Sequence, residues 1–273
     1  MSGRIELKTR EQMRVMARAG VIVERALAAA RAACVPGART ADVDAAAAAV
    51  IAEAGATSNF LGYHGFPATT CVSVNEEVVH GIPGDRVLAA GDLVSVDCGA
   101  VVEGWHGDSA ITVIVGGDAS RQDRALVAAT DRALWAGIAA LATADRISDV
   151  SAAIEEVADE ARLHPIDGYV GHGIGTQMHQ APDVPNYRTR GRSPRVRPGM
   201  CLALEPMLVI GTDESDGLQD VLLPVHGHIA QFTRLEPGGR AGQKQAAHQG
   251  HRSGKGDRFQ LIRHWAPYCS AWP

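Results

Sequence analysis

The amino-acid sequence predicts an α/β fold, in the broad α+β sense, made of two pseudo-symmetric halves with a functional site between them. One observation is an internal repeat: residues 26–55 align without a gap on residues 133–162, and both stretches are alanine-rich and helical in pattern. A second observation is that each stretch is succeeded by a glycine, a mostly apolar run typical of a buried strand, and a carboxylate. These strands are GDLVSVD, which ends at Asp97, and GMCLALE, which ends at Glu205.

Capping signals indicate where the helices begin and end. Thr9 can cap the first helix, because Gln12 follows three residues later as in a capping box. Thr40 is expected to cap the second helix, and Gly55 is expected to end it. A second pair of helices follows in the other half of the repeat. The four helices are expected at residues 9–33, 40–55, about 120–143 and 148–162.

Composition and charge exclude several classes of protein. The net charge of −5 gives no general reason to expect binding to DNA. The N-terminus lacks an apolar stretch of signal-peptide length, and no run of about 18 apolar residues predicts a membrane span. The five cysteines are scattered without a C-x-x-C spacing, which favours reduced thiols in a cytosol. We therefore expect a cytoplasmic protein with neither DNA nor a membrane as a partner.

Two acids near the middle of the chain indicate a cation site. Beyond Asp97 the chain reaches Asp108, and the apolar run ITVIV that comes next is typical of a returning strand, so a hairpin could bring Asp108 beside Asp97. A carboxylate at the end of a buried strand is costly unless it is paired or binds a cation, and two like charges in a dry site repel. One or two divalent metal ions would resolve this repulsion.

A glycine-flanked histidine fits the same site. His172 lies in GHGIGTQMHQAP, where it can add a neutral nitrogen to the carboxylates of Asp97, Asp108 and Glu205. Carboxylate oxygens with one imidazole suit manganese, iron, cobalt or zinc. Each residue alone also fits an ordinary role in a turn, on the surface or in the core. The joint pattern is what favours a metal site.

Four motifs lie in order along the chain: SVNEEVVHGIP (73–83), VDCGAVVEGWHGD (96–108), GHGIGTQMHQAP (171–182) and PGMCLALEPM (198–207). Together they resemble those of type I methionine aminopeptidases, which share the pita-bread fold with creatinase and prolidase. The resemblance runs from about residue 5 to residue 220. It implies two pseudo-symmetric halves, each with paired helices on a curved, largely antiparallel sheet. It also implies a metalloaminopeptidase that removes the initiator methionine from nascent proteins and prefers small second residues.

The resemblance assigns metal ligands residue by residue. Two divalent ions (cobalt, manganese, iron or zinc) are implied, with Asp97 on one ion and Asp108 bridging both. His172 and Glu205 would complete the shell of the other ion, and a second bridging glutamate is expected further along the chain. Glu205 would also carry a proton to the leaving amine after attack by metal-activated water.

The resemblance also assigns a substrate side. His80 and His179 would hydrogen-bond the scissile peptide, with His179 stabilising the oxyanion and His80 positioning the peptide. Tyr63, Phe66 and Cys71 fall where the family shapes its pocket for the methionine side chain. The substrates would be nascent polypeptides at the ribosome, and the enzyme would act as a monomer.

The match ends after Asp220. The family pattern requires a tryptophan over the pocket, and this chain has Val221 in the following position. Counting forward from Glu205 without gaps places Glu236 at the fifth ligand position, whereas aligning the strand AQF places Thr233 there. We favour Glu236, because threonine cannot replace a bridging carboxylate.

The end of the chain fits no part of the family. We expect a catalytic domain at 1–237 and a disordered tail at 238–273, which has six Lys or Arg residues against one Asp. A basic arm for ribosomal RNA and an altered reading frame are the alternatives for this tail. The region also motivates a second hypothesis of function, a catalytically impaired homologue that binds peptides or partners.

Overall fold

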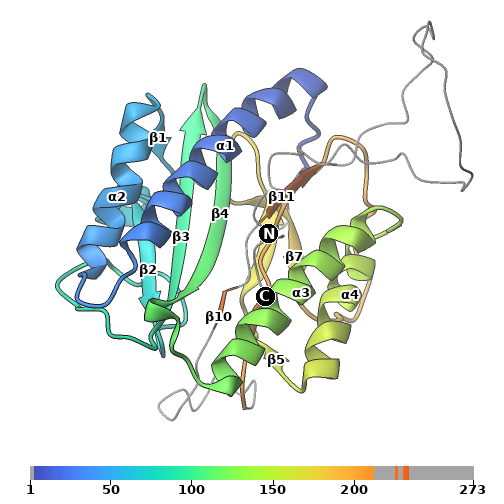
Figure 1. Cartoon of the computed structure of the whole chain (residues 1–273). Coiled ribbons are helices and arrows are strands. Elements are labelled where there is room, and N and C mark those ends of the chain that lie inside the picture. The colour runs from blue at the N-terminus through green and yellow to red at the C-terminus, as the bar shows by residue number, and fades with distance from the viewer. Residues whose placement is uncertain (1–2, 212–224, 227–229, 234–273) are drawn as a thin grey trace, which may run out of the picture.

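A computed structural model describes residues 3–211, 225–226 and 230–233. Figure 1 shows two halves, each with a pair of helices on the outside and strands toward the middle of the molecule. No helix within the described residues is both long and apolar enough to cross a membrane. Four of the five cysteines fall in the described residues, and all four are free thiols, as the sequence predicts.

The first half has helices α1 and α2 on a four-stranded antiparallel sheet. Strands β1 and β2 both pair with β3 along one edge, and β4 pairs with β3 along the other. A short 3-10 helix at Tyr63–Gly65 lies between β1 and β2. The elements are α1 (Arg10–Ala33), α2 (Thr40–Glu53), β1 (Thr57–Ser58), β2 (Thr70–Val74), β3 (Leu93–Val102) and β4 (Trp105–Ile114).

The second half repeats the helix pair and adds two small antiparallel sheets. The strand order is β11-β8-β6-β7 in one sheet and β10-β9-β5 in the other. Another 3-10 helix, Val115–Gly117, precedes the first helix of this half. The elements are α3 (Arg121–Leu141), α4 (Ile147–Ala161), β5 (His164–Pro165), β6 (Val170–Gly173), β7 (Gln180–Pro185), β8 (Cys201–Leu204), β9 (Met207–Val209), β10 (Val225–His226) and β11 (Ala230–Thr233).

The predicted pair of helices in each half is confirmed, and one predicted cap is wrong. Thr9 caps α1 in a capping box with Gln12, as the sequence indicates. Thr40, however, is the first residue of α2 rather than its cap, because Arg39 occupies the cap position and its N–H donates to the carboxylate of Asp42. The Thr40 hydroxyl instead exchanges hydrogen bonds with the backbone of Gly84.

Each half has its own hydrophobic core. Helix α1 packs on β3 and β4 through side chains such as Val23 and Leu27, whereas Leu134 of α3 and Ile154 of α4 pack in the second core. Burial of one such side chain contributes about 1.5–3 kcal/mol. The cores of the two halves are separate clusters.

Small residues let the sheets of the two halves approach each other. Ala110 of β4 and Ala203 of β8 are both fully buried and form a cluster of their own between the halves. Methyl groups leave room for polar side chains from neighbouring positions. The interface between the halves is therefore where side chains from both sheets can meet.

Candidate metal centre

Asp97 and Asp108 lie on the same face of the β3–β4 hairpin. Asp97 is paired with Ala110 and Gly99 with Asp108, so the two acids are diagonal neighbours across the two strands. The predicted hairpin is confirmed, but Asp97 does not end its strand. Strand β3 continues five residues beyond it to Val102, because the apolar residues after Asp97 keep pairing with β4.

His172 lies in β6 between two glycines that leave no room for side chains. A Cβ atom on Gly171 would lie 2.4 Å from the carbonyl oxygen of Ala203 in β8. A Cβ atom on Gly173 would lie 2.2 Å from the carbonyl oxygen of Ala181 in β7. The glycines therefore let both neighbouring strands press against the backbone that carries His172.

The orientation of the His172 ring is fixed by a backbone contact. Its Nδ1 lies 2.9 Å from the carbonyl oxygen of Gly173. A carbonyl can only accept, so Nδ1 carries the proton in the neutral ring and Nε2 presents a lone pair. This arrangement is the usual way in which a metal-binding histidine is oriented.

Glu205 lies immediately after β8, at a break in the strand. Pro206 follows it, and a proline has no N–H to continue a strand ladder, so the next strand begins only at Met207. The backbone carbonyl of Glu205 accepts a hydrogen bond of 2.7 Å from the buried Asn186 side chain. The prediction that Glu205 directly follows a buried strand is correct.

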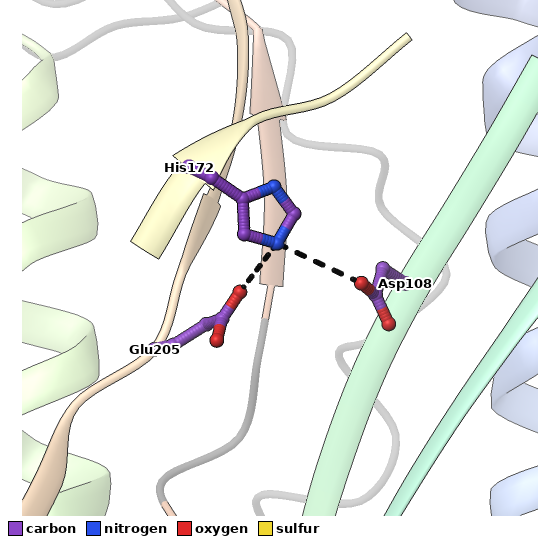
Figure 2. Close-up of side chains that lie close together, drawn as sticks. All are labelled: Asp108, His172 and Glu205. Carbon is purple, nitrogen blue, oxygen red and sulfur yellow. Dashed lines mark ion pairs between the residues drawn. The ribbon is translucent and has the colours of Figure 1, made fainter. Parts of the chain in front are cut away.

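The side chains of Asp108, His172 and Glu205 converge in the interface between the halves (Figure 2). Nε2 of His172 lies 2.8 Å from Oε1 of Glu205 and 3.9 Å from Oδ2 of Asp108. One ligand atom from each residue lies within 4.8 Å of the others. Asp97 is not in this group of three, but its carboxyl group and that of Asp108 are hydrogen-bond partners.

The protonation of the cluster is strongly perturbed. Burial, with the charges of Asp108 and Glu205, raises the pKa of Asp97 well above its usual range. Burial and Glu205 raise the pKa of Asp108 to about 7. Burial lowers the pKa of His172, but the carboxylates of Glu205 and Asp108 outweigh it and raise that pKa to about 9. Without a cation, the site retains protons to offset its negative charge.

The donor set fits a divalent metal ion. Four buried atoms, one each from Asp97, Asp108, His172 and Glu205, have no hydrogen-bond partner among the described residues. Buried polar atoms are rarely left unsatisfied, and these four are all atoms that ligate metals. A cation could satisfy them together and displace the protons that the cluster holds.

His179 lies beside the cluster and is held from the opposite side. Its ring centroid is 4.3 Å from that of His172, and its Nδ1 is 3.2 Å from the hydroxyl of Tyr63. Burial and the neighbouring His172 lower the pKa of His179 to about 4, so its ring is neutral near pH 7. His80 is exposed, lies within the loop between β2 and β3, and also contributes to lowering this pKa.

An apolar cluster borders the site. Phe60, Cys71 and Met178 are buried together and Phe66 packs against them, with the two phenyl rings edge-on at 6.5 Å. Cys71 is paired with Asp97 across β2 and β3, which places the cluster next to the acids. Phe66 and Cys71 thus share one surface, whereas Tyr63 lies against His179.

Comparison with known proteins identifies the family to which the chain belongs. Metallopeptidase family M24 matches residues 14–236. A curated relative, methionine aminopeptidase 1 of Mycobacterium tuberculosis, is 50% identical over 216 residues, which cover 77% of this chain and 81% of the relative. The chain belongs to the methionine aminopeptidases of metallopeptidase family M24.

Solved structures of methionine aminopeptidases have the same fold. The enzyme from Thermotoga maritima has a TM-score of 0.76 and 37% identity, and the alignment covers 85% of this chain and 95% of that one. The enzyme from Rickettsia prowazekii has a TM-score of 0.74 and 28% identity, with 85% and 94% covered. The predicted pita-bread fold and the predicted family are confirmed.

The candidate site of this methionine aminopeptidase includes residues that the sequence did not single out. Phe60 and Met178 complete the apolar cluster. Met178 could have been predicted from the sequence, because it directly precedes His179 in the glycine-rich motif. His106, two residues before Asp108 in β4, hydrogen-bonds Asn59 at 3.1 Å and lies close enough to His179 to lower its pKa.

The fifth metal ligand proposed for this methionine aminopeptidase falls beyond the described structure. Glu236 lies outside the described residues, as does Val221. Thr233, the other position considered for this ligand, is the last residue of β11 and is paired with Cys201 of β8. The candidate ligands within the described residues are therefore Asp97, Asp108, His172 and Glu205.

Proposed function

We propose that this chain is a methionyl aminopeptidase that removes the N-terminal methionine from nascent proteins. The observation that carries the proposal is the convergence of Asp108, His172 and Glu205 from both halves of a methionine aminopeptidase fold. The alternative, a homologue that binds peptides without cleaving them, is not favoured. That alternative was based only on the divergent C-terminal sequence, whereas the cluster of metal-binding donors lies within the described residues.

The catalytic metal is proposed to be a pair of divalent ions of cobalt, manganese, iron or zinc. Asp97, Asp108, His172 and Glu205 would hold it, with Glu236 as the fifth ligand. A bound divalent ion supplies an activated water near neutral pH and polarises the carbonyl of the scissile bond. Three carboxylates with one imidazole are a donor set typical of these divalent ions, which supports the proposal.

The roles of the other polar groups depend on their neighbours. Glu205 has one carboxylate oxygen beside His172 and is the proposed carrier of a proton to the leaving amine. His179 is neutral, so with the Tyr63 hydroxyl at Nδ1 it can donate from Nε2 to the oxygen of the scissile carbonyl. His80, exposed at the same side, is proposed to position the peptide.

The apolar cluster is the proposed binding surface for the methionine side chain. Phe66 and Cys71 were expected there, and the packing adds Phe60 and Met178. A thioether makes favourable contacts with aromatic rings and with other sulfur atoms. A small second residue is preferred in this proposal because bulk next to the scissile bond would meet the metal ligands.

The cellular setting and the chain division complete the proposal. The substrates would be nascent polypeptides at the ribosome. The enzyme would be a monomer in the cytoplasm. Residues 1–237 would form the catalytic domain, and 238–273 would be a basic tail that is not needed for the chemistry.

Methionine release from a Met-Ala-Ser peptide by the purified full-length chain tests the function. We expect release after addition of a divalent metal, none after exhaustive chelation, and recovery when metal is restored. Asp108→Asn should abolish release, whereas Asp159→Asn, on the exposed end of α4, should leave it unchanged. Release that persists in the chelated protein would contradict the metal mechanism, and no release with any metal would contradict the function.

A further inference from the structure

Two charged residues before α1 form a contact that the proposed chemistry does not use. The side chain of Lys8 is 1% exposed, and its Nζ lies 3.4 Å from Oε2 of Glu6 and donates to the Glu6 carbonyl at 3.2 Å. A lysine is rarely buried to this degree unless it is paired, because removing its charge from water is costly. The pair is therefore a specific structural contact and not a loose surface ion pair.

Glu6 is bound on its other side to a loop of the second half. Its carboxylate accepts from the Thr176 N–H at 3.2 Å, from the Thr176 hydroxyl at 3.0 Å and from the Gln180 side chain at 2.9 Å. Burial raises the pKa of Glu6, but these hydrogen bonds and Lys8 outweigh it and lower the pKa. The ionised carboxylate is thus the form that holds the loop.

This loop, residues 174–179, connects β6 to β7 and is held by two further elements. The N–H of Ile174 donates to the Cys201 carbonyl of β8 at 3.1 Å, and the N–H of His106 of β4 donates to the Gly175 carbonyl at 3.0 Å. A Cβ atom on Gly175 would lie 2.2 Å from Oε2 of Glu6. The loop is therefore packed between the two sheets and the segment before α1.

Three consecutive residues, where the loop ends and β7 begins, face three different partners. Met178 is buried in the apolar cluster, the His179 ring lies against that of His172, and the Gln180 side chain bonds Glu6. A displacement of Gln180 would carry both preceding residues with it. The contact of Glu6 with the loop is thus coupled through the backbone to the two residues that face the substrate side.

We propose that Glu6 and Lys8 are positioning residues, which fix the loop 174–179 and thereby place His179 and Met178 for the N-terminal methionine of the substrate. Neither residue touches the substrate. The backbone N–H of Lys8 also donates to the Gly199 carbonyl at 2.7 Å, so the segment before α1 is anchored to the residues just before β8 as well. The consequence for catalysis rests on the proposed function, whereas the fixing of the loop does not.

Hydrogen exchange of the full-length protein tests the fixing of the loop without reference to activity. We expect Glu6→Gln to increase exchange at the amides of residues 175–179 at least about tenfold, because a neutral amide accepts more weakly than a carboxylate. Exchange in α3 and α4 should not change. The control is Glu11→Gln, which removes an exposed ion pair with Arg14 on α1 and should alter neither region. Unchanged loop exchange, or an equal increase throughout the chain, would overturn the proposal.

Steady-state kinetics with the same Met-Ala-Ser peptide test the positioning. We expect Glu6→Gln to raise KM about tenfold with a smaller decrease in kcat, because the methionine side chain contacts the displaced Met178 surface. Thr176→Val should act in the same direction, and Thr176→Ser, which keeps the hydroxyl, should restore values near wild type. Bound metal, measured in the same samples, should not change.

The two hypotheses fail in different ways. A wild-type chain that never releases methionine would refute the proposed function, while the exchange experiment would still decide whether Glu6 fixes the loop. Faster loop exchange in Glu6→Gln with wild-type KM and kcat would show that the contact is structural only, and would overturn the positioning role.

Discussion

The Nε2 atom of His172 lies 2.8 Å from Oε1 of Glu205, and neither atom has a hydrogen-bond partner among the described residues. The two residues come from β6 and from the break after β8, and Asp108 reaches them from the other half of the molecule. An imidazole nitrogen and a carboxylate oxygen at this separation are placed to ligate one cation between them. Both side chains are therefore expected to bind the same ion.

Replacement of His172 by alanine should abolish tight metal binding. Loss of residues that only orient a ligand typically costs 10- to 100-fold in metal affinity, so loss of the ligand itself should cost more than about 100-fold. Titration calorimetry with manganese or zinc, and metal content after dialysis, are the measurements. His164→Ala in β5, whose imidazole is exposed, is the matched control. Unchanged metal content in His172→Ala would refute the proposed ligand role.

The metal-free protein should lose stability as pH rises. The pKa values of Asp108 (about 7) and His172 (about 9) are raised in the folded state, so their contributions are present at low pH and are lost as pH rises through these values. The free energy of unfolding in urea should therefore decrease between pH 6 and pH 9 in chelator. With saturating metal the decrease should vanish, because metal displaces the protons and binds more tightly at higher pH. If the free energy of unfolding changed with pH in the same way with and without metal, this linkage would be contradicted.

Removal of the Tyr63 hydroxyl should slow the enzyme modestly. Tyr63→Phe removes the 3.2 Å contact with Nδ1 of His179 and leaves the ring in place. One such hydrogen bond contributes about 0.5–1.5 kcal/mol, which corresponds to a decrease of about 2- to 12-fold in kcat/KM. Tyr187→Phe removes a hydroxyl that bonds Asp167, away from the proposed substrate side, and serves as the control. Equal kcat/KM in the two variants would argue against the orienting role of Tyr63.

A methyl group at Gly173 should disrupt the β6–β7 contact. Because its Cβ would lie 2.2 Å from the Ala181 carbonyl oxygen, the strands must separate, and we expect Gly173→Ala to destabilise the protein by at least about 2 kcal/mol. Urea unfolding and metal affinity are the measurements, since His172 would move with the strand. Gly84→Ala is the control, because its nearest neighbouring atom would lie 4.0 Å away. A Gly173→Ala protein with the same free energy of unfolding as wild type would show that β6 and β7 can separate without loss of stability, and would contradict this prediction.

The helices and the halves were predictable because their signals are local. The capping box at Thr9 and Gln12 and the alanine-rich helical pattern are written within a few residues, and the structure confirms them. The cap of α2 was missed by one residue, because the Thr40 hydroxyl is taken by Gly84, more than forty residues away. The end of β3 was placed too early because the sequence shows where a carboxylate lies but not how far its strand stays paired.

The sequence by itself determined the family, the duplicated α/β architecture and the acids and imidazole proposed as ligands, because their motifs and order are read directly along the chain. Only the tertiary structure decided which side chains surround them. Met178 and Phe60 share a surface with Cys71, and Glu6 reaches a loop about 170 positions away, through packing between segments distant in sequence. Long-range contacts of this kind depend on the relative placement of the two halves, and no local pattern of residues encodes that placement.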